Sequence, residues 1–257
     1  MIDSLQQREI FHLEFLRDLN RTLKPECYVL KGGTNLRFFF GSIRYSEDLD
    51  IDVKGITVSA LKDKVMAIIQ SPTLNTILRP FNIGEIIPPD LGKAKQTQTV
   101  QRFKVHLITT DGEDLFTKIE FSRRGFEPGT KVEMVIPAVT RFYKSAPLIV
   151  PHYSLETAAL QKIRALADRK EIQARDLFDL FILHNRVEDT KAIKGTPREK
   201  VAVANKNILS LTYSQYRDTV VDYLPEEDQP AWSSETFWDE IRLRTSAFLE
   251  NLLKEYE

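Results

Sequence analysis

The segment Lys31-Gly32-Gly33-Thr34-Asn35-Leu36-Arg37, followed by the acidic segment Asp48-Leu49-Asp50-Ile51-Asp52, decides the fold. A run of β-formers at 28–30 leads into the glycine pair, which predicts a strand and then a turn. Thr34 is the expected N-cap of a helix over 35–40. Because side chains alternate along a strand, the acidic segment predicts three aspartates on one face. Burying them unpaired would be costly, and a divalent cation such as Mg²⁺, which prefers oxygen ligands, would relieve their repulsion.

The composition is that of an ordinary globular chain. The 257 residues are 42% hydrophobic and 28% charged, and the net charge of −1 gives no overall basic signal for nucleic acid. The single cysteine, Cys27, excludes a disulfide framework and fits a reducing compartment, and in the buried strand expected there it would be a poor catalytic thiol. Residues 1–20 do not resemble a signal peptide, and no apolar run approaches a membrane span. We therefore expect a cytoplasmic protein without membrane contact.

The chain changes character near residue 150. Before it, the patterns predict helices over 2–23, 57–70 and 72–81, an irregular loop over 82–95, a hairpin of strands over 97–109 and 115–123, and a strand over 131–136. After it, they predict helices over 154–169, 174–185, 200–210, 213–224 and 233–257, with a polar loop over 188–197. The expected fold class is α+β: a mixed sheet with flanking helices in residues 1–150, followed by a helical domain in residues 151–257.

The strand around Glu120 is the candidate partner of the acidic strand. Alternation places Lys118, Glu120 and Ser122 on one face. Beside Asp48 and Asp50, Glu120 would complete a cluster of three carboxylates able to hold one or two Mg²⁺ ions and a nucleoside triphosphate. The alternative is a solvated strand face with alternating lysine and glutamate, which the acidic strand upstream makes the weaker interpretation.

Two residues in the helical half each have two interpretations. Lys162 shares a helix face with Leu166 and Arg169, so it either extends its ammonium group to water or reaches a triphosphate. Asp176 lies near a helix start, three residues before Asp179. The residues alone favour a capping role for Asp176 over orienting Lys162 or acting as a base.

The remaining signals are weaker. Gly32-Gly33 is either a plain turn or a phosphate cradle at a helix N-terminus, and Arg37 and Arg44 either neutralise phosphates or form structural ion pairs. The four histidines lack metal-ligand spacing, and the aromatic run 38–40 is expected in the core rather than as a base-stacking platform. Basic residues near the strands would form an RNA-binding patch if the fold gathers them, with a solvated surface as an equal alternative. They are Lys93, Lys95, Arg102, Lys104, Arg123, Arg124 and Lys131.

Four blocks together resemble the AbiEii/AbiGii nucleotidyltransferase-like toxins of the polymerase-β-type nucleotidyltransferase superfamily. They are 31–37 with Arg44-Tyr45-Ser46-Glu47-Asp48-Leu49-Asp50, then 118–122, 162–166 and Arg175-Asp176-Leu177-Phe178-Asp179-Leu180. The match spans residues 28–183. Two departures from the superfamily pattern are Gly-Gly-Thr in place of Gly-Ser and glutamate as the third acid.

The resemblance implies a nucleotidyltransferase-like fold and a toxin of a bacterial toxin–antitoxin or abortive-infection pair. Its antitoxin is typically a winged-helix transcriptional regulator. The toxin would transfer a nucleotidyl group from an NTP to RNA, with the tRNA 3′ end as the expected acceptor. Alternatives are nucleotidyl or phosphoryl transfer to a protein such as the antitoxin, or a non-catalytic nucleotide-binding module. The implied roles are metal binding (Mg²⁺ or Mn²⁺) by Asp48, Asp50 and Glu120, nucleotide contacts by Gly32, Gly33, Thr34 and Ser46, triphosphate binding by Lys162, and a role in transfer for Asp176.

Overall fold

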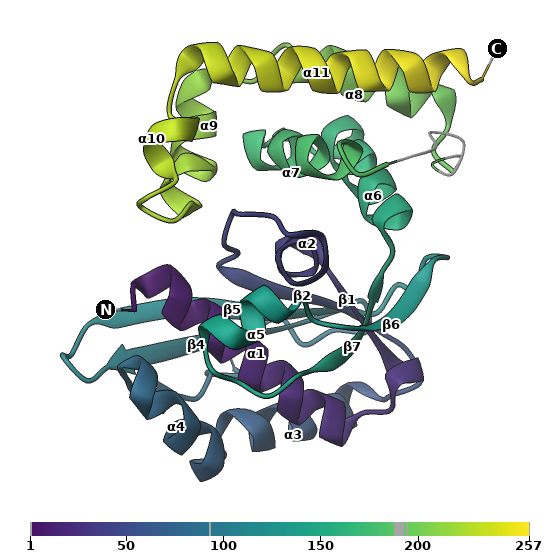
Figure 1. Ribbon diagram of the computed structural model, residues 1–257. Coiled ribbons are helices and arrows are strands. Elements are labelled where there is room, and N and C mark those ends of the chain that lie inside the picture. Colours follow the sequence, from purple (N-terminus) through teal and green to yellow (C-terminus); the bar gives the residue numbers. More distant parts are fainter. Residues whose placement is uncertain (1, 93, 188–192, 194, 257) are drawn as a thin grey trace. The chain divides into compact units, whose positions relative to one another are not determined.

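The computed structural model of the chain describes residues 2–92, 94–187, 193 and 195–256 (Figure 1). The chain forms two compact units. The first, called the sheet unit, comprises Met1–Phe39 and Tyr45–Tyr153, and the second, called the helical unit, comprises Phe40–Arg44 and Ser154–Glu257. The main division thus lies three residues beyond the predicted boundary after residue 150. The inclusion of Phe40–Arg44 in the helical unit was not predicted.

The sheet unit is built on a mixed sheet with the strand order β3-β4-β5-β2-β1-β7-β6. The predicted mixture of parallel and antiparallel pairing is confirmed: β2 pairs with β5 and β1 with β7 in parallel, and the other neighbours are antiparallel. The predicted hairpin is also confirmed, as β4 and β5. The strands are β1 (Tyr28–Lys31), β2 (Asp48–Val53), β3 (Ile83–Ile87), β4 (Val100–Thr109), β5 (Asp114–Ser122), β6 (Thr130–Met134) and β7 (Ile149–Tyr153).

Helices cover one side of this sheet with an apolar core. In Figure 1, α1 (Ser4–Thr22), α3 (Val58–Ile69) and α4 (Pro72–Leu78) lie on the same side of the strands. Leu49 and Ile51 of β2 are fully buried with Phe121 of β5 in the cluster that these helices complete. The aspartates that alternate with these apolar residues therefore lie on the opposite face. Burial of the apolar face thereby fixes which way the acidic face points.

Local signals explain where the helices begin. The side chain of Asp3 accepts hydrogen bonds from the first turn of α1 in a capping box, and Thr57 caps α3 as predicted. Short helical segments complete the unit: η1 (Pro25–Cys27), η2 (Arg79–Phe81) and α5 (Pro137–Phe142). Cys27 ends η1 and is only partly buried, so the expectation that it lies in a buried strand was wrong.

The helical unit follows the predicted pattern closely. It contains α6 (Leu155–Asp168), α7 (Ala174–His184), α8 (Arg198–Ile208), α9 (Tyr213–Thr219), η4 (Val221–Tyr223), α10 (Gln229–Trp232) and α11 (Glu235–Lys254). Ser154 caps α6, and Tyr216 stacks on Trp238 with their ring centroids 4.7 Å apart. Most of the polar loop expected over 188–197 lies outside the described residues. Within the described ranges, every helix is too short or too polar to cross a bilayer.

Candidate active site

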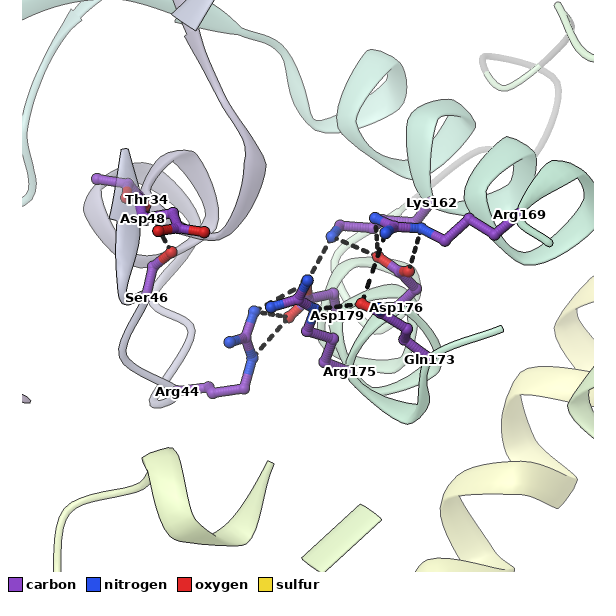
Figure 2. A network of polar contacts seen from close by, with 10 residues as sticks. All are labelled: Thr34, Arg44, Ser46, Asp48, Lys162, Arg169, Gln173, Arg175, Asp176 and Asp179. Carbon is purple, nitrogen blue, oxygen red and sulfur yellow. Dashed lines mark hydrogen bonds and ion pairs between the residues drawn. The ribbon is translucent and has the colours of Figure 1, made fainter. Parts of the chain in front are cut away.

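The glycine pair is the first turn of a helix rather than a separate turn. Helix α2 (Gly32–Phe40) begins at Gly32, so Thr34 lies inside the helix and the prediction that it caps the helix was wrong. Gly32 has φ +70°, a left-handed conformation that glycine adopts without a steric penalty, and this residue takes the chain directly from β1 into α2. Thr34 Oγ1 and Ser46 Oγ both donate to the carbonyl oxygen of Asp48, at 3.1 and 2.8 Å (Figure 2).

Gly32 also passes very close to the acidic strand. A Cβ atom at this position would lie 2.6 Å from Oδ2 of Asp50. A real Cβ cannot approach an oxygen so closely, so any other residue would have to displace the carboxylate or the helix start. The glycine therefore positions the beginning of α2 against Asp50, in addition to supplying its own conformational freedom.

The acidic face exists as predicted from the alternation of β2. In the register, Asp50 is opposite Lys31 of β1 and Glu120 of β5, and Asp48 is opposite Lys118. The carboxylates have basic partners: Lys118 Nζ lies 2.8 Å from Asp48 Oδ2, and Arg102 Nε lies 2.5 Å from Glu120 Oε2.

Asp52, the third aspartate of the strand, has two partners of its own. Its carboxylate accepts hydrogen bonds from Lys31 Nζ at 2.5 Å and from the hydroxyl of Tyr153 at 2.7 Å. These bonds satisfy both oxygens of a buried carboxylate and tie β1, β2 and β7 together. This arrangement gives Asp52 a structural role.

The chemistry of Asp48 and Asp50 fits a divalent cation. Burial raises the pKa of Asp50, Lys31 opposes this, and the neighbouring Asp48 and Glu120 add to the rise. A cation beside these oxygens would offset both the burial and the repulsion. Within the described part of the chain, however, no group of three His, Cys, Asp or Glu side chains is arranged to hold a metal ion. Glu120 is engaged by Arg102, and its role as a third ligand stays a prediction.

A second charged cluster lies in the helical unit (Figure 2). Lys162 Nζ of α6 lies 3.0 Å from Asp176 Oδ1 and 2.6 Å from Asp179 Oδ2, both on α7. Arg44 contacts both oxygens of Asp179 at 3.1 Å, and Arg169 Nε lies 2.9 Å from Asp176 Oδ2. Three cations thus meet two carboxylates, which leaves one positive charge in excess.

This cluster bears on two of the interpretations of Lys162 and Asp176, and their roles toward a nucleotide stay predictions. Lys162 is only 12% exposed, so it does not extend into water. The N-cap of α7 is Gln173, so the capping role favoured for Asp176 was wrong, and Asp176 contacts Lys162 instead. Burial alone would lower the pKa of Lys162, but Asp179 and Asp176 outweigh it and raise the pKa.

Asp179 was not among the predicted site residues, although it is fully buried at the centre of this cluster. Burial would raise the pKa of Asp179, but Arg44 and Lys162 outweigh it and hold the pKa below its usual range. The available signal was its spacing of three residues from Asp176 on one helix. Arg44 was predicted either to neutralise phosphate or to form a structural ion pair, and it pairs with Asp179.

The other predicted features are scattered or structural. Arg37 pairs with Glu9 at 2.7 Å and lies over the Tyr45 ring, and Phe38 is buried in the core as expected. The basic residues do not all form one patch, because Lys131 lies on β6 at one edge of the sheet while Arg102 and Lys104 lie on β4 near the other. Lys93 lies outside the described residues.

Comparison with known structures supports the fold. A proposed nucleotidyltransferase from Helicobacter pylori shares 22% identity, with a TM-score of 0.58 over 96% of this chain and 97% of that one. The JHP933 protein of Helicobacter pylori shares 23% identity, with a TM-score of 0.53 over 97% and 98%. The nucleotidyltransferase toxin MenT4 of Mycobacterium tuberculosis H37Rv shares 16% identity, with a TM-score of 0.58 over 98% and 94%.

The sequence comparison gives the family. No curated protein matches the chain. The family model described as "Nucleotidyl transferase AbiEii toxin, Type IV TA system" matches residues 14–253, which is nearly the whole chain. Because this match covers most of the chain, the chain belongs to the AbiEii nucleotidyltransferase toxin family of type IV toxin–antitoxin systems.

Proposed function

We propose that this protein is a metal-dependent nucleotidyltransferase that transfers a nucleotidyl group from an NTP to RNA, with the 3′ end of tRNA as the acceptor. One observation supports it above the others. Asp48 and Asp50 lie two residues apart on one sheet face, with the start of α2 packed against Asp50 through Gly32. A helix N-terminus favours anionic groups, and paired carboxylates favour a divalent cation.

The chain's own residues would divide the work as follows. Asp48 and Asp50 would hold Mg²⁺ or Mn²⁺, which when bound would offset the charge of the triphosphate. Gly32, Gly33, Thr34 and Ser46 line the start of α2 and the loop before β2, where phosphate oxygens would be bound. Lys162 would bind the triphosphate, and Asp176, which now holds Lys162, would set the position of its ammonium group.

Two other functions remain to be separated from this one. The acceptor could be a protein such as the antitoxin that the family implies, for which we propose a winged-helix regulator. The ion pairs of Asp48 with Lys118 and of Glu120 with Arg102 favour a further alternative, a nucleotide-binding module without turnover. Such a module would bind an NTP and release it unchanged.

The test is transfer of label from each NTP to total tRNA in the presence of Mg²⁺. We expect wild type and the surface control Asp63→Asn to label RNA, and Asp48→Asn to label nothing. Asp63 lies on α3, on the helix-covered side of the sheet, so the control removes one carboxylate without touching the acidic face. Label on a co-expressed antitoxin, seen as a mass increase, would identify a protein acceptor. NTP binding by wild type without any transfer would identify the non-catalytic module.

A further inference from the structure

An exposed aromatic pair lies on the acidic face of the sheet, outside the residues assigned above. The side chain of Phe116 on β5 is 62% exposed. It stacks on His106 of β4, its cross-strand partner, with ring centroids 4.6 Å apart and planes 19° apart. His106 is partly buried, so the phenyl ring of Phe116 provides the exposed π surface, and every nucleic-acid base can stack on such a surface.

The position of this pair relative to the carboxylates follows from the register. Phe116 precedes Lys118 by two residues and therefore shares its face, and Lys118 is opposite Asp48 on β2. Two residues of strand span about 7 Å and neighbouring strands lie about 4.8 Å apart, which places Phe116 about 8 Å from Asp48. The pair is therefore within reach of an acceptor whose terminal hydroxyl lies at the carboxylates.

Two lysines lie between the aromatic pair and the carboxylates. Lys104 of β4 and Lys118 of β5 are direct cross-strand partners, and Lys104 is exposed. Like charges opposite each other destabilise a sheet, and Asp48 offsets only one of them. A phosphate group between the two ammonium groups would relieve this repulsion, so the charge pattern fits an anionic chain crossing the two strands.

The backbone beneath Phe116 is held on both sides. Arg8 Nε donates to the carbonyl oxygen of Phe116 at 2.9 Å. Thr117 Oγ1 donates to the carbonyl of Glu47 at 2.6 Å and contacts His12 Nε2 at 2.7 Å. His106 Nε2 lies 2.6 Å from Asp114, which fixes the imidazole behind the phenyl ring. A surface that is already ordered loses little entropy when a base stacks on it.

We propose that Phe116 and His106 form the stacking platform for a base at the single-stranded end of the RNA acceptor, and that Lys104 contacts the adjoining phosphate. This proposal rests on the proposed function and deepens it, because it assigns the acceptor a site. A protein acceptor has no need of an aromatic surface flanked by phosphate-binding lysines. The simpler role, an aromatic pair that only stabilises the hairpin, predicts no effect on RNA affinity.

The experiment is an anisotropy titration of the full-length protein with a short, fluorescently labelled single-stranded RNA, without NTP. We expect Phe116→Ala to weaken binding by roughly 5- to 150-fold, as for loss of one stacked base, and Phe116→Trp to restore it. The control is Phe142→Ala on α5, which removes a phenylalanine of similar exposure (55%) next to Tyr143, whose hydroxyl contacts α1 on the helix-covered side of the sheet. We expect the control to bind as wild type, and Lys104→Ala to weaken binding with a shallower salt dependence.

A second probe identifies the stacked group. With an RNA that lacks the terminal base, wild type and Phe116→Ala should bind equally weakly, because the interaction that the substitution removes is already gone. Equal affinity of wild type and Phe116→Ala for the intact RNA would overturn the proposal, as would absence of RNA binding by wild type. Transfer to RNA that does not depend on Phe116 would leave the proposed function standing without this site. Binding that depends on Phe116 without any transfer would leave the site standing without the function.

Discussion

Gly32 and Gly55 are two glycines with the same backbone conformation and different surroundings. Both have φ +70°, but a Cβ at Gly32 would meet Asp50 Oδ2 at 2.6 Å, whereas nothing lies within 4 Å at Gly55. We expect Gly55→Ala to lower the free energy of unfolding by about 1–2 kcal/mol through left-handed strain alone. Gly32→Ala should cost at least about 1 kcal/mol more, because it also displaces the carboxylate. Denaturant unfolding followed by circular dichroism measures both, and equal losses would show that the close approach to Asp50 costs nothing.

His12 predicts a loss of stability in mild acid. Burial, with a smaller effect from Arg8, lowers its pKa to about 3 from the ordinary histidine value of 6.5. Below pH 6.5 the unfolded chain takes up a proton that the folded chain does not. The free energy of unfolding therefore decreases as the pH is lowered. From this residue we expect a loss of about 2 kcal/mol between pH 7.5 and pH 5.

The check on His12 is the variant His12→Gln. Because the hydroxyl of Thr117 donates to the carbonyl oxygen of Glu47, its oxygen accepts a hydrogen bond from the Nε2–H of His12, and a glutamine amide can donate the same bond. The variant should lose about 2 kcal/mol less than wild type over this pH range. His184 of the helical unit also has a lowered pKa, about 4, so only the difference between variant and wild type isolates His12. Parallel pH profiles for the two proteins would contradict the assignment.

At the scale of elements, strong periodicity predicted most helices and the central strands. Strands in stretches that contain proline or glycine were not predicted. Strand β3 lies in a stretch with Gly84, Pro88 and Pro89, and β7 contains Pro151, so both were missed. Each is a strand because it pairs with a neighbour distant in sequence, β3 with β4 and β7 with β1 and β6. Such pairing depends on tertiary context, which local propensity does not contain.

The candidate site shows the same limit. Alternation along β2 predicted correctly that Asp48 and Asp50 share a face. The apolar residues between and beside them are buried in the core, so the aspartates lie on the opposite face. The pairing of this strand with the one that carries Lys118 and Glu120 was also predicted correctly. The contact of Arg102 with Glu120 was not predicted, because Arg102 comes from β4 through the strand register. Asp179 was missed for a similar reason, since its partner Arg44 is far away in sequence.

Helix α7 is held to α6 and to residue 44 through the buried carboxylate of Asp179. Asp179→Asn would remove the negative charge that Arg44 and Lys162 share. Breaking a buried ion pair on one side costs about 3–5 kcal/mol, so we expect a loss of that size in the free energy of unfolding. The control Asp218→Asn breaks the exposed pair with Arg217 and should cost less than about 1 kcal/mol.

Tryptophan fluorescence measures the Asp179 prediction without interference from the sheet unit. The chain has two tryptophans, Trp232 and Trp238, and both lie in the helical unit. We expect the fluorescence transition of Asp179→Asn to move to lower denaturant, while Asp218→Asn stays near wild type. Equal shifts in the two variants would show that losing the buried ion pair of Asp179 costs no more stability than losing the exposed pair of Asp218.

At the scale of the whole molecule, the chain crosses between its two units more than once. It leaves the sheet unit at Phe40, returns at Tyr45 and leaves again at Ser154. The segment Phe40–Arg44 lies in the sequence between the glycine pair and the acidic strand. These two parts of the candidate site are therefore joined by a segment of the helical unit. Cutting the chain after residue 153 would therefore take Arg44 away from Asp179 and weaken the helical unit.

Membership of a toxin family leads to a prediction about growth. If toxicity depends on nucleotidyl transfer, induced expression of wild type should arrest bacterial growth, and Asp48→Asn should not. Asp48 is partly exposed and pairs with Lys118 across the strands, so its replacement by the isosteric asparagine removes charge with little loss of stability. Asp63→Asn on α3 is the matched control and should arrest growth as wild type does. Growth curves, with immunoblots to equalise protein levels, provide the measurement. If Asp48→Asn arrests growth as strongly as wild type does, toxicity does not depend on this carboxylate. That result would favour the non-catalytic module, because nucleotide binding alone requires fewer acidic ligands than transfer does.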